Sequence, residues 1–108
     1  MTDNPQPQPG IYLIVEFDWP DNVTKEQAGN AYRLHQVVRD KEWIRGVVAG
    51  SGGIGGAQSS IWIFWLESYA ALGRLLRDQE DEVGQVYNAF FKEMPNVVDR
   101  VREEVVVT

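Results

Sequence analysis

The sequence predicts an α+β protein in which helices cover one face of an antiparallel four-stranded sheet. Apolar residues alternate in strand-like fashion near the start of the chain, and apolar residues at spacings of three and four follow between residues 24 and 43. The chain has 108 residues, and a domain of that size buries roughly 60–70% of the surface of its unfolded form. We therefore expect a polar, Pro-rich arm over residues 1–10 and a single domain over residues 11–108.

The predicted elements follow from periodicity, caps and breakers. Thr24 and Ser68 are helix N-cap candidates, and Pro20 and Pro95 end the segments before them. The predicted strands are residues 11–19, 44–49, 60–66 and 101–107; the predicted helices run from Thr24 to residues 40–43, onward from Ser68, and over residues 81–93. This order, β-α-β-β-α-(α)-β, is the ferredoxin-like split βαβ arrangement, a sheet with helices on one face.

Composition excludes several functions. The chain has no cysteine, so it can form neither a disulfide, a thiolate metal site nor a cysteine nucleophile. Its formal charge is −6, with 10 Lys and Arg against 16 Asp and Glu, which argues against nucleic acid as a partner because phosphate binding depends on basic side chains. No apolar run reaches the roughly 20 residues that span a bilayer, and the first ten residues do not resemble a signal peptide. We expect no membrane association and a cytoplasmic location.

Both faces of the predicted sheet are apolar, although helices can cover only one. In the third strand Ile61, Ile63 and Trp65 alternate with Trp62, Phe64 and Leu66. We expect Trp62, Phe64 and Ile14 on the face that the helices leave open, where exposure would forgo roughly 1.5–3 kcal/mol for each large side chain. The sequence thus predicts a homodimer in which two sheets meet as a β-barrel and enclose space for a ligand.

Two familiar motif types are weak here. Residues 50–55 match G-x-G-x-x-G, but a dinucleotide site needs a helix to follow, and a strand pattern follows instead. We interpret residues 50–59 as a flexible hairpin loop that borders or gates a pocket mouth. A single histidine and scattered carboxylates supply no metal-ligand spacing. We expect neither a cofactor nor a metal.

His35 is the first candidate for chemistry. It is the only histidine, histidine is the only side chain whose ordinary pKa lies near neutrality, and His35 lies beside the apolar stripe of the first helix. Glu16 shares a strand face with apolar Ile14 and is the second catalytic candidate. The residues we expect to line a substrate cavity are all aromatic: Tyr12, Tyr32, Trp62, Phe64 and Tyr87. The residues alone leave open whether His35 is catalytic or a structural histidine.

The sequence resembles the EthD-like branch of the dimeric α+β barrel proteins. In that family a histidine near the end of the first helix precedes the second strand, as His35 precedes Ile44 by nine residues. The family's strand followed by a "serine, aromatic, small, leucine" helix start is similar to residues 62–72. Residues 86–91 and 102–106 resemble its terminal aromatic segment and its acidic last strand. The likeness covers residues 11–107.

The resemblance implies a homodimer with a pocket in each subunit and cofactor-free chemistry on small aromatic, polyketide-like or lactone compounds. His35 takes the place of the family's inward histidine. The chain has Val105 where relatives often have a second histidine, so a mechanism that needs two histidines is excluded. The first hypothesis is an isomerase, cyclase or related lyase in which His35 shuttles a proton and Glu16 or Tyr12 orients the substrate. The alternatives are a non-catalytic ligand-binding or accessory subunit and a cofactor-free monooxygenase.

Overall fold

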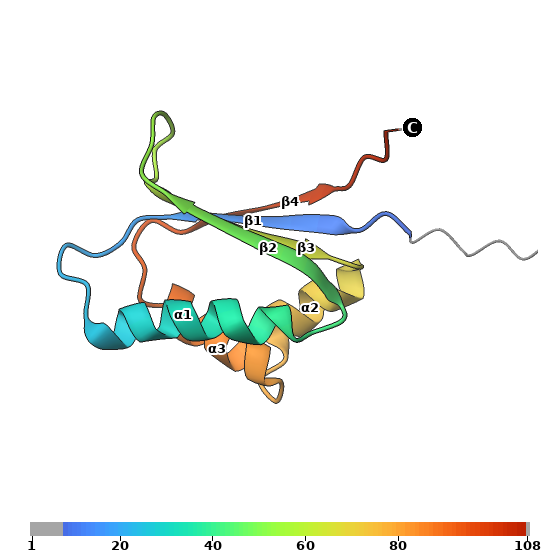
Figure 1. The fold of residues 1–108 in the computed structure, drawn as a ribbon, viewed down its shortest axis with the longest axis horizontal. Coiled ribbons are helices and arrows are strands. Elements are labelled where there is room, and N and C mark those ends of the chain that lie inside the picture. The colour runs from blue at the N-terminus through green and yellow to red at the C-terminus, as the bar shows by residue number, and fades with distance from the viewer. Residues whose placement is uncertain (1–7, 108) are drawn as a thin grey trace, which may run out of the picture.

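The computed structural model describes residues 8–107, which form a sheet with three helices on one of its faces (Figure 1). Residues 1–7 of the predicted arm lie outside the described residues. The elements in chain order are β1 (Ile11–Phe17), α1 (Lys25–Arg39), β2 (Ile44–Ser51), β3 (Ser60–Leu66), α2 (Tyr69–Arg77), α3 (Glu82–Phe91) and β4 (Val98–Glu103).

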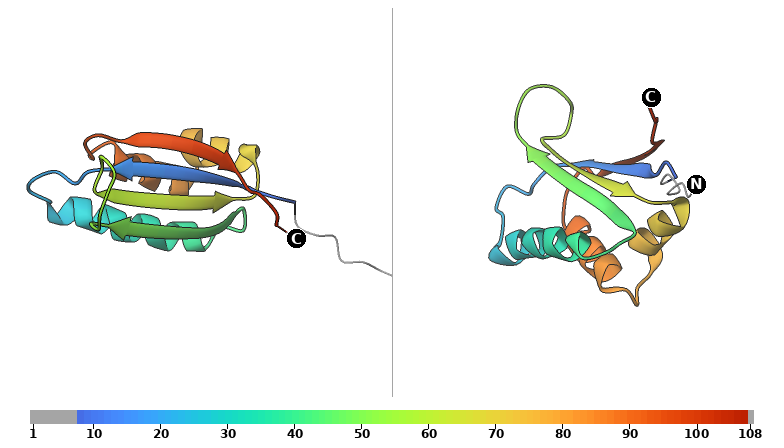
Figure 2. Two further views of the ribbon diagram at one scale, coloured as in Figure 1. Left: turned by 90° about the horizontal axis from the view of Figure 1, so that it is seen from above. Right: turned by 45° about the vertical axis from the view of Figure 1, so that its right-hand side comes forward.

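The sheet is antiparallel throughout, with the strand order β2-β3-β1-β4. Figure 2 shows the four strands side by side, with β2 and β4 at the two edges. The chain-order neighbours β2 and β3 pair as a hairpin, whereas β1 and β3 are the two inner strands. The predicted ferredoxin-like α+β fold is confirmed.

A side-chain oxygen caps the N-terminus of each helix within residues 8–107. Thr24 and Gln27 form a capping box at α1, in which each side chain accepts the backbone N–H of the other. The hydroxyl of Ser68 accepts the N–H of Ala71 at α2, and the Asp81 carboxylate accepts the N–H of Val83 at α3. Thr24 and Ser68 are thus confirmed as N-caps.

The hydrophobic core lies between the helices and one face of the two inner strands. In β1 the buried positions alternate with half-buried ones, and β3 follows the same alternation in register, so that Leu13 lies opposite Phe64 and Val15 opposite Trp62. Phe17 contacts Phe90 edge to face at 5.7 Å between ring centroids. The core residues are Ile11, Leu13, Val15, Phe17, Leu34, Val38, Trp43, Ile44, Trp62, Phe64, Leu66, Ala71, Leu75, Val83, Val86, Tyr87, Phe90, Phe91 and Met94.

The expected placement of Trp62 and Phe64 on the open face was wrong. Phe64 is completely buried and Trp62 is 6% exposed, both beneath the helices. Because Leu13 and Val15 lie opposite them in the register, all four side chains must share one face. The face that the helices leave open instead carries Ile61, Ile63 and Trp65 of β3 beside Tyr12, Ile14 and Glu16 of β1, with Val48 of β2 and Val98, Arg100 and Arg102 of β4 next to them.

The fourth strand begins and ends earlier than the predicted residues 101–107. Asn96 adopts a left-handed conformation (φ 59°), and β4 starts two residues later at Val98. Its last register pair is Glu103 opposite Ile11, where β1 begins, and one further backbone hydrogen bond runs from the N–H of Glu104 to the carbonyl of Gly10. Val105, Val106 and Val107 consequently lie outside the sheet and are exposed.

The Gly-rich segment is confirmed as the hairpin connection between β2 and β3. Gly52, Gly53, Gly55 and Gly56 all have positive φ values between 77° and 96°, which residues other than glycine rarely adopt. Figure 1 shows this loop and the C-terminal end on the side of the sheet opposite the helices. Ile54 at the loop is fully exposed. No helix within residues 8–107 is long and apolar enough to cross a membrane.

Replacing Gly84 with alanine should destabilise the fold. A Cβ at this position of α3 would lie 2.4 Å from the carbonyl oxygen of Asp78, so α3 has to move away from the end of α2. We expect urea denaturation to show a loss of about 1–3 kcal/mol, the usual cost of overpacking.

Gly29→Ala is the matched control, because a Cβ there meets nothing within 4 Å. Alanine in an exposed helix position should raise the free energy of unfolding by roughly 0.5–1 kcal/mol. A Gly84→Ala protein as stable as the natural one would contradict the close packing of α2 and α3.

Candidate functional site

His35 lies at the boundary between the core and an open groove. On α1 the buried residues Leu34 and Val38 face the sheet, and His35 lies beside them, half-buried. Its ring meets the ring of Trp62 edge to face, with centroids 6.1 Å apart and planes at 74°. The single histidine is therefore held against an aromatic floor by the helix that carries it.

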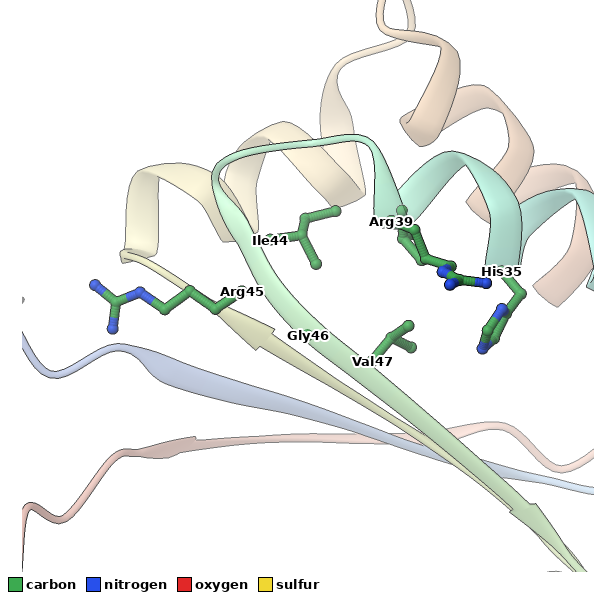
Figure 3. Close-up of a pocket in the computed structure, with 7 residues that line it drawn as sticks. His35, Arg39, Ile44, Arg45, Gly46 and Val47 are labelled. Atoms are coloured by element: carbon green, nitrogen blue, oxygen red, sulfur yellow. The ribbon is translucent and has the colours of Figure 1, made fainter.

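A pocket of about 490 Å³ opens between the end of α1 and the start of β2 (Figure 3). It forms here because β2 is an edge strand, so no further strand closes the space beyond it. The pocket is lined by His35, Val38, Arg39, Ile44, Arg45, Gly46 and Val47. In Figure 3 His35 and Arg39 lie side by side below α1, and Val47 points towards them from β2.

Arg45 borders this pocket without directing its charge into it. The pairing of β2 with β3 is irregular between Ile44 and Gly46, and such a bulge turns the extra residue's side chain. The guanidinium of Arg45 lies over the ring of Trp65 at 5.7 Å and 3.6 Å from Glu104. Figure 3 accordingly shows Arg45 pointing away from His35 and Arg39.

A second hollow of about 280 Å³ continues along the same side of β2. It is lined by Phe17, Trp19, Ala49, Gly50, Ser51, Ser60 and Trp62. Val47 of the first pocket and Ala49 of the second lie two residues apart on the helix-facing side of β2, opposite Phe64 and Trp62. Since His35 contacts Trp62, we treat the two hollows as one feature, the α1–β2 groove, defined by the two sets of lining residues.

The α1–β2 groove combines apolar walls with a few polar groups. Its walls are aliphatic at Val38 and Val47 and aromatic at Trp62. The polar groups are the His35 imidazole, the Arg39 guanidinium and, at the far end, the hydroxyl pair of Ser51 and Ser60, whose oxygens are 2.8 Å apart. Such a surface suits a small ligand with an apolar body, and the imidazole can donate or accept a proton there.

Among the predicted cavity residues, Trp62 lines the groove, whereas Phe64 and Tyr87 lie in the core behind it. Phe64 packs between Trp62 (5.8 Å) and Tyr87 (5.6 Å) and is fully buried. Burial, together with the charge of Asp99, raises the pKa of Tyr87 far above its ordinary value, so its hydroxyl stays protonated. These two rings support Trp62 from behind.

The other predicted site residues lie elsewhere. Tyr32 is 68% exposed and its hydroxyl accepts a hydrogen bond from Gln36 on the outer side of α1. Tyr12 stacks on Trp65 at 6.3 Å, and Glu16 forms an ion pair with Arg100, both on the open face. The structure therefore does not bring Glu16 to His35, because the sheet itself separates the two side chains. A catalytic role for Glu16 stays a prediction.

Glu104 anchors the end of the open face. One carboxylate oxygen accepts the N–H of Gly10 at 2.8 Å and the indole N–H of Trp65 at 2.9 Å. These two hydrogen bonds, with a smaller contribution from the charge of Arg45, lower the pKa of Glu104 below its ordinary value despite the opposing effect of burial. This carboxylate therefore ties the residues after β4 to β1 and β3.

Sequence reasoning missed Arg39 and Trp19 as groove residues. Arg39 follows His35 by four residues, which places both on the same side of a helix. This spacing could have indicated that Arg39 lies beside His35. Trp19 lies beyond β1 and reaches the groove through contacts with Phe17 and Phe90, which no local pattern indicates. Within residues 8–107 no group of three or more His, Asp or Glu side chains is placed to hold a metal.

Comparison with known proteins identifies the fold. The sequence matches no protein-family model and no curated protein. Among solved structures, a dimeric ferredoxin-like protein of unknown function from Thermobifida fusca has 17% identity and a TM-score of 0.64, over 98% of this chain and all of that one. A hydroxynitrile lyase from Passiflora edulis has 11% identity and a TM-score of 0.70, over 95% and 99%.

An EthD family protein from Bacillus halodurans is also similar, with 16% identity and a TM-score of 0.57 over 89% of this chain and 99% of that one. The expected resemblance to dimeric ferredoxin-like and EthD proteins is thus confirmed at the level of the fold. At these identities the shared fold is what the likeness establishes.

The lowered pKa of Glu104 predicts a specific loss of stability in acid. A carboxyl whose pKa is lower in the folded state stabilises the fold above its unfolded pKa of about 4.3. That contribution is lost as the pH falls through the lower, folded value. We expect the difference in melting temperature between the natural protein and Glu104→Gln to be largest near pH 6 and to shrink towards pH 3.

Glu67→Gln is the control, since Glu67 is exposed near the same end of the sheet; its effect on melting temperature should vary less with pH. Equal pH profiles for the two variants would refute the anchoring role of Glu104.

Proposed function

We propose that this chain is one subunit of a homodimer whose α1–β2 groove binds a small apolar or aromatic compound. His35 then acts as the acid–base group of a cofactor-independent isomerase, cyclase or related lyase. The observation that carries the proposal is the position of the only imidazole of the chain, in the wall of a 490 Å³ pocket and against Trp62.

The groove supports proton transfer to or from a bound compound. An aromatic or lactone ring that packs on Trp62 and Val47 displaces water from the side of the groove where His35 lies. A proton can then move between the imidazole and an acidic carbon or oxygen of the ligand, a contribution typically worth about 10²–10⁴-fold in rate. Buried Tyr87 keeps its proton and is not a base in this scheme.

Known proteins of this fold agree with such a role. A hydroxynitrile lyase has nearly the same chain length and fold, so the architecture accommodates a lyase site. Polyketide-like and lactone compounds are the substrate classes that the EthD-like resemblance implies for the groove of this chain.

The open face supports the homodimer. Ile14, Ile63 and Trp65 lie on it with no helix above them, and Val48 beside them is 62% exposed. The side chains of Ile14, Ile63 and Trp65 are already partly buried, so covering each of them contributes less than the roughly 1.5–3 kcal/mol of a fully exposed side chain. Four charges of this face are partnered, since Glu16 pairs with Arg100 and Glu104 with Arg45, which lowers the cost of bringing a second sheet against them. Arg102 forms no ion pair within residues 8–107. Two solved structures of this fold are described as dimeric.

A non-catalytic binding role is the second candidate. Within the described residues no carboxylate lines the pocket that contains His35, and Glu16 lies across the sheet. A carboxylate that orients the imidazole is a common feature of histidine acid–base sites. Without one, the same groove suits a carrier or an accessory subunit that holds an apolar ligand unchanged.

Replacing Ile63 with glutamate should convert the dimer to a monomer, because each subunit then places an unpaired charge in an apolar interface. We expect sedimentation equilibrium to show a dimer for the natural protein and at least about a 100-fold weaker association for Ile63→Glu.

Tyr32→Glu introduces the same charge on the exposed side of α1 and should remain dimeric. A natural protein that is monomeric at 100 µM, an order-of-magnitude working concentration well above typical dimer affinities, would overturn the assembly.

Replacing His35 with alanine should abolish turnover while the dimer stays intact. The protein would be incubated with aromatic β-diketones, lactones and hydroxynitriles, and products followed by mass spectrometry. For any compound that the natural protein converts, we expect His35→Ala to lower the rate about 10²–10⁴-fold.

Gln36→Ala, on the exposed side of the same helix, should leave the rate unchanged. A fully active His35→Ala protein would remove His35 from the mechanism. Compounds that bind in the groove and are released unchanged would establish the non-catalytic role instead.

A further inference from the structure

The first pocket of the α1–β2 groove presents two nitrogen-bearing side chains side by side. His35 and Arg39 lie four residues apart on α1, and both line the pocket. Figure 3 shows the Arg39 guanidinium extending alongside the His35 ring, below the helix and facing β2. The pocket wall opposite them is apolar, formed by Ile44 and Val47.

The charge of Arg39 is not balanced within the pocket. None of the residues that line the pocket is acidic. Within residues 8–107, Arg39 forms no ion pair shorter than 4 Å, whereas Arg33 on the outer side of the same helix pairs with Glu82 at 3.8 Å. Asp40 is absent from this lining and borders a separate hollow, which Arg39 also lines. The pocket therefore offers a cation beside apolar walls.

This combination matches a carboxylate with an apolar body. The planar fork of a guanidinium donates two parallel hydrogen bonds to a carboxylate. Arg39 is exposed and can receive such a ligand, whose apolar body would lie against Val38 and Val47. One guanidinium and one imidazole suit a single negative charge. Arg39 also lies in the last turn of α1, where a cation stabilises the helix, so a test has to separate ligand binding from helix stability.

We infer that the α1–β2 groove selects small apolar compounds that carry a carboxylate, and that Arg39 binds this carboxylate next to His35. The inference rests on the proposed function, since it names the ligand class of the same groove. A ligand bound in this way lies beside His35, with its charged end at Arg39 and its apolar body against Val47 and Trp62.

The test compares 2-naphthoate with its neutral analogue 2-naphthamide by isothermal titration calorimetry on the natural dimer. We expect 2-naphthoate to bind roughly 10- to 100-fold more tightly, the usual range for a hydrogen-bonded charge. Arg39→Gln should remove this preference and leave the affinity for 2-naphthamide unchanged. A role of Arg39 in helix stability alone would weaken both compounds equally and would overturn the inference.

Arg33→Gln is the matched control, because it removes the same charge from the outer side of α1 and should keep the preference for 2-naphthoate. If the natural protein binds the two compounds equally well, the carboxylate selectivity is refuted. If Trp62→Leu then weakens the binding of both, the groove is still the binding site. If neither compound binds, the result counts against the proposed function itself.

Discussion

The alternation of side chains along the two inner strands is the constraint on which the rest of this structure depends. Because β1 and β3 pair in register, one set of side chains, including Val15 and Phe64, is buried beneath the helices. The other set, including Ile14 and Ile63, has to face the opposite side. A shift of one residue would exchange the two sets, so the core and the open face are determined together.

The groove follows from the same arrangement, combined with the place of β2 at the sheet edge. α1 covers the helix-facing side of the sheet, but no strand lies beyond β2 to close the space between them. The helical spacing of four residues puts both His35 and Arg39 at this opening, and Trp62, buried by the register of β3, forms its floor. Core packing thus supplies one wall of the site, and helix periodicity supplies its polar groups.

The sequence predicted the element order, two N-caps and the hairpin loop because these depend on local chemistry. It did not predict which face of β3 the helices cover, since both faces are equally apolar and only the register with β1 decides between them. The expectation that Glu16 orients a substrate for His35 depended on that choice, and the sheet separates the two side chains. Trp19 reaches the groove through contacts with Phe90, which is distant in the sequence. The end of β4 depends on where β1 begins. Neither feature could be predicted from the residues next to it in the sequence.

The central claim is that a second copy covers the open face while the α1–β2 groove stays accessible. Relaxation of labelled Ile and Val methyl groups by a soluble gadolinium chelate tests it without any ligand. Exposed Ile54 and buried Val15 provide the two reference values. We expect Val48 and Ile63 to relax as slowly as Val15, and Val47 in the groove to relax measurably faster. If sedimentation shows a dimer and Val48 nevertheless relaxes as fast as Ile54, the second copy does not cover the open face.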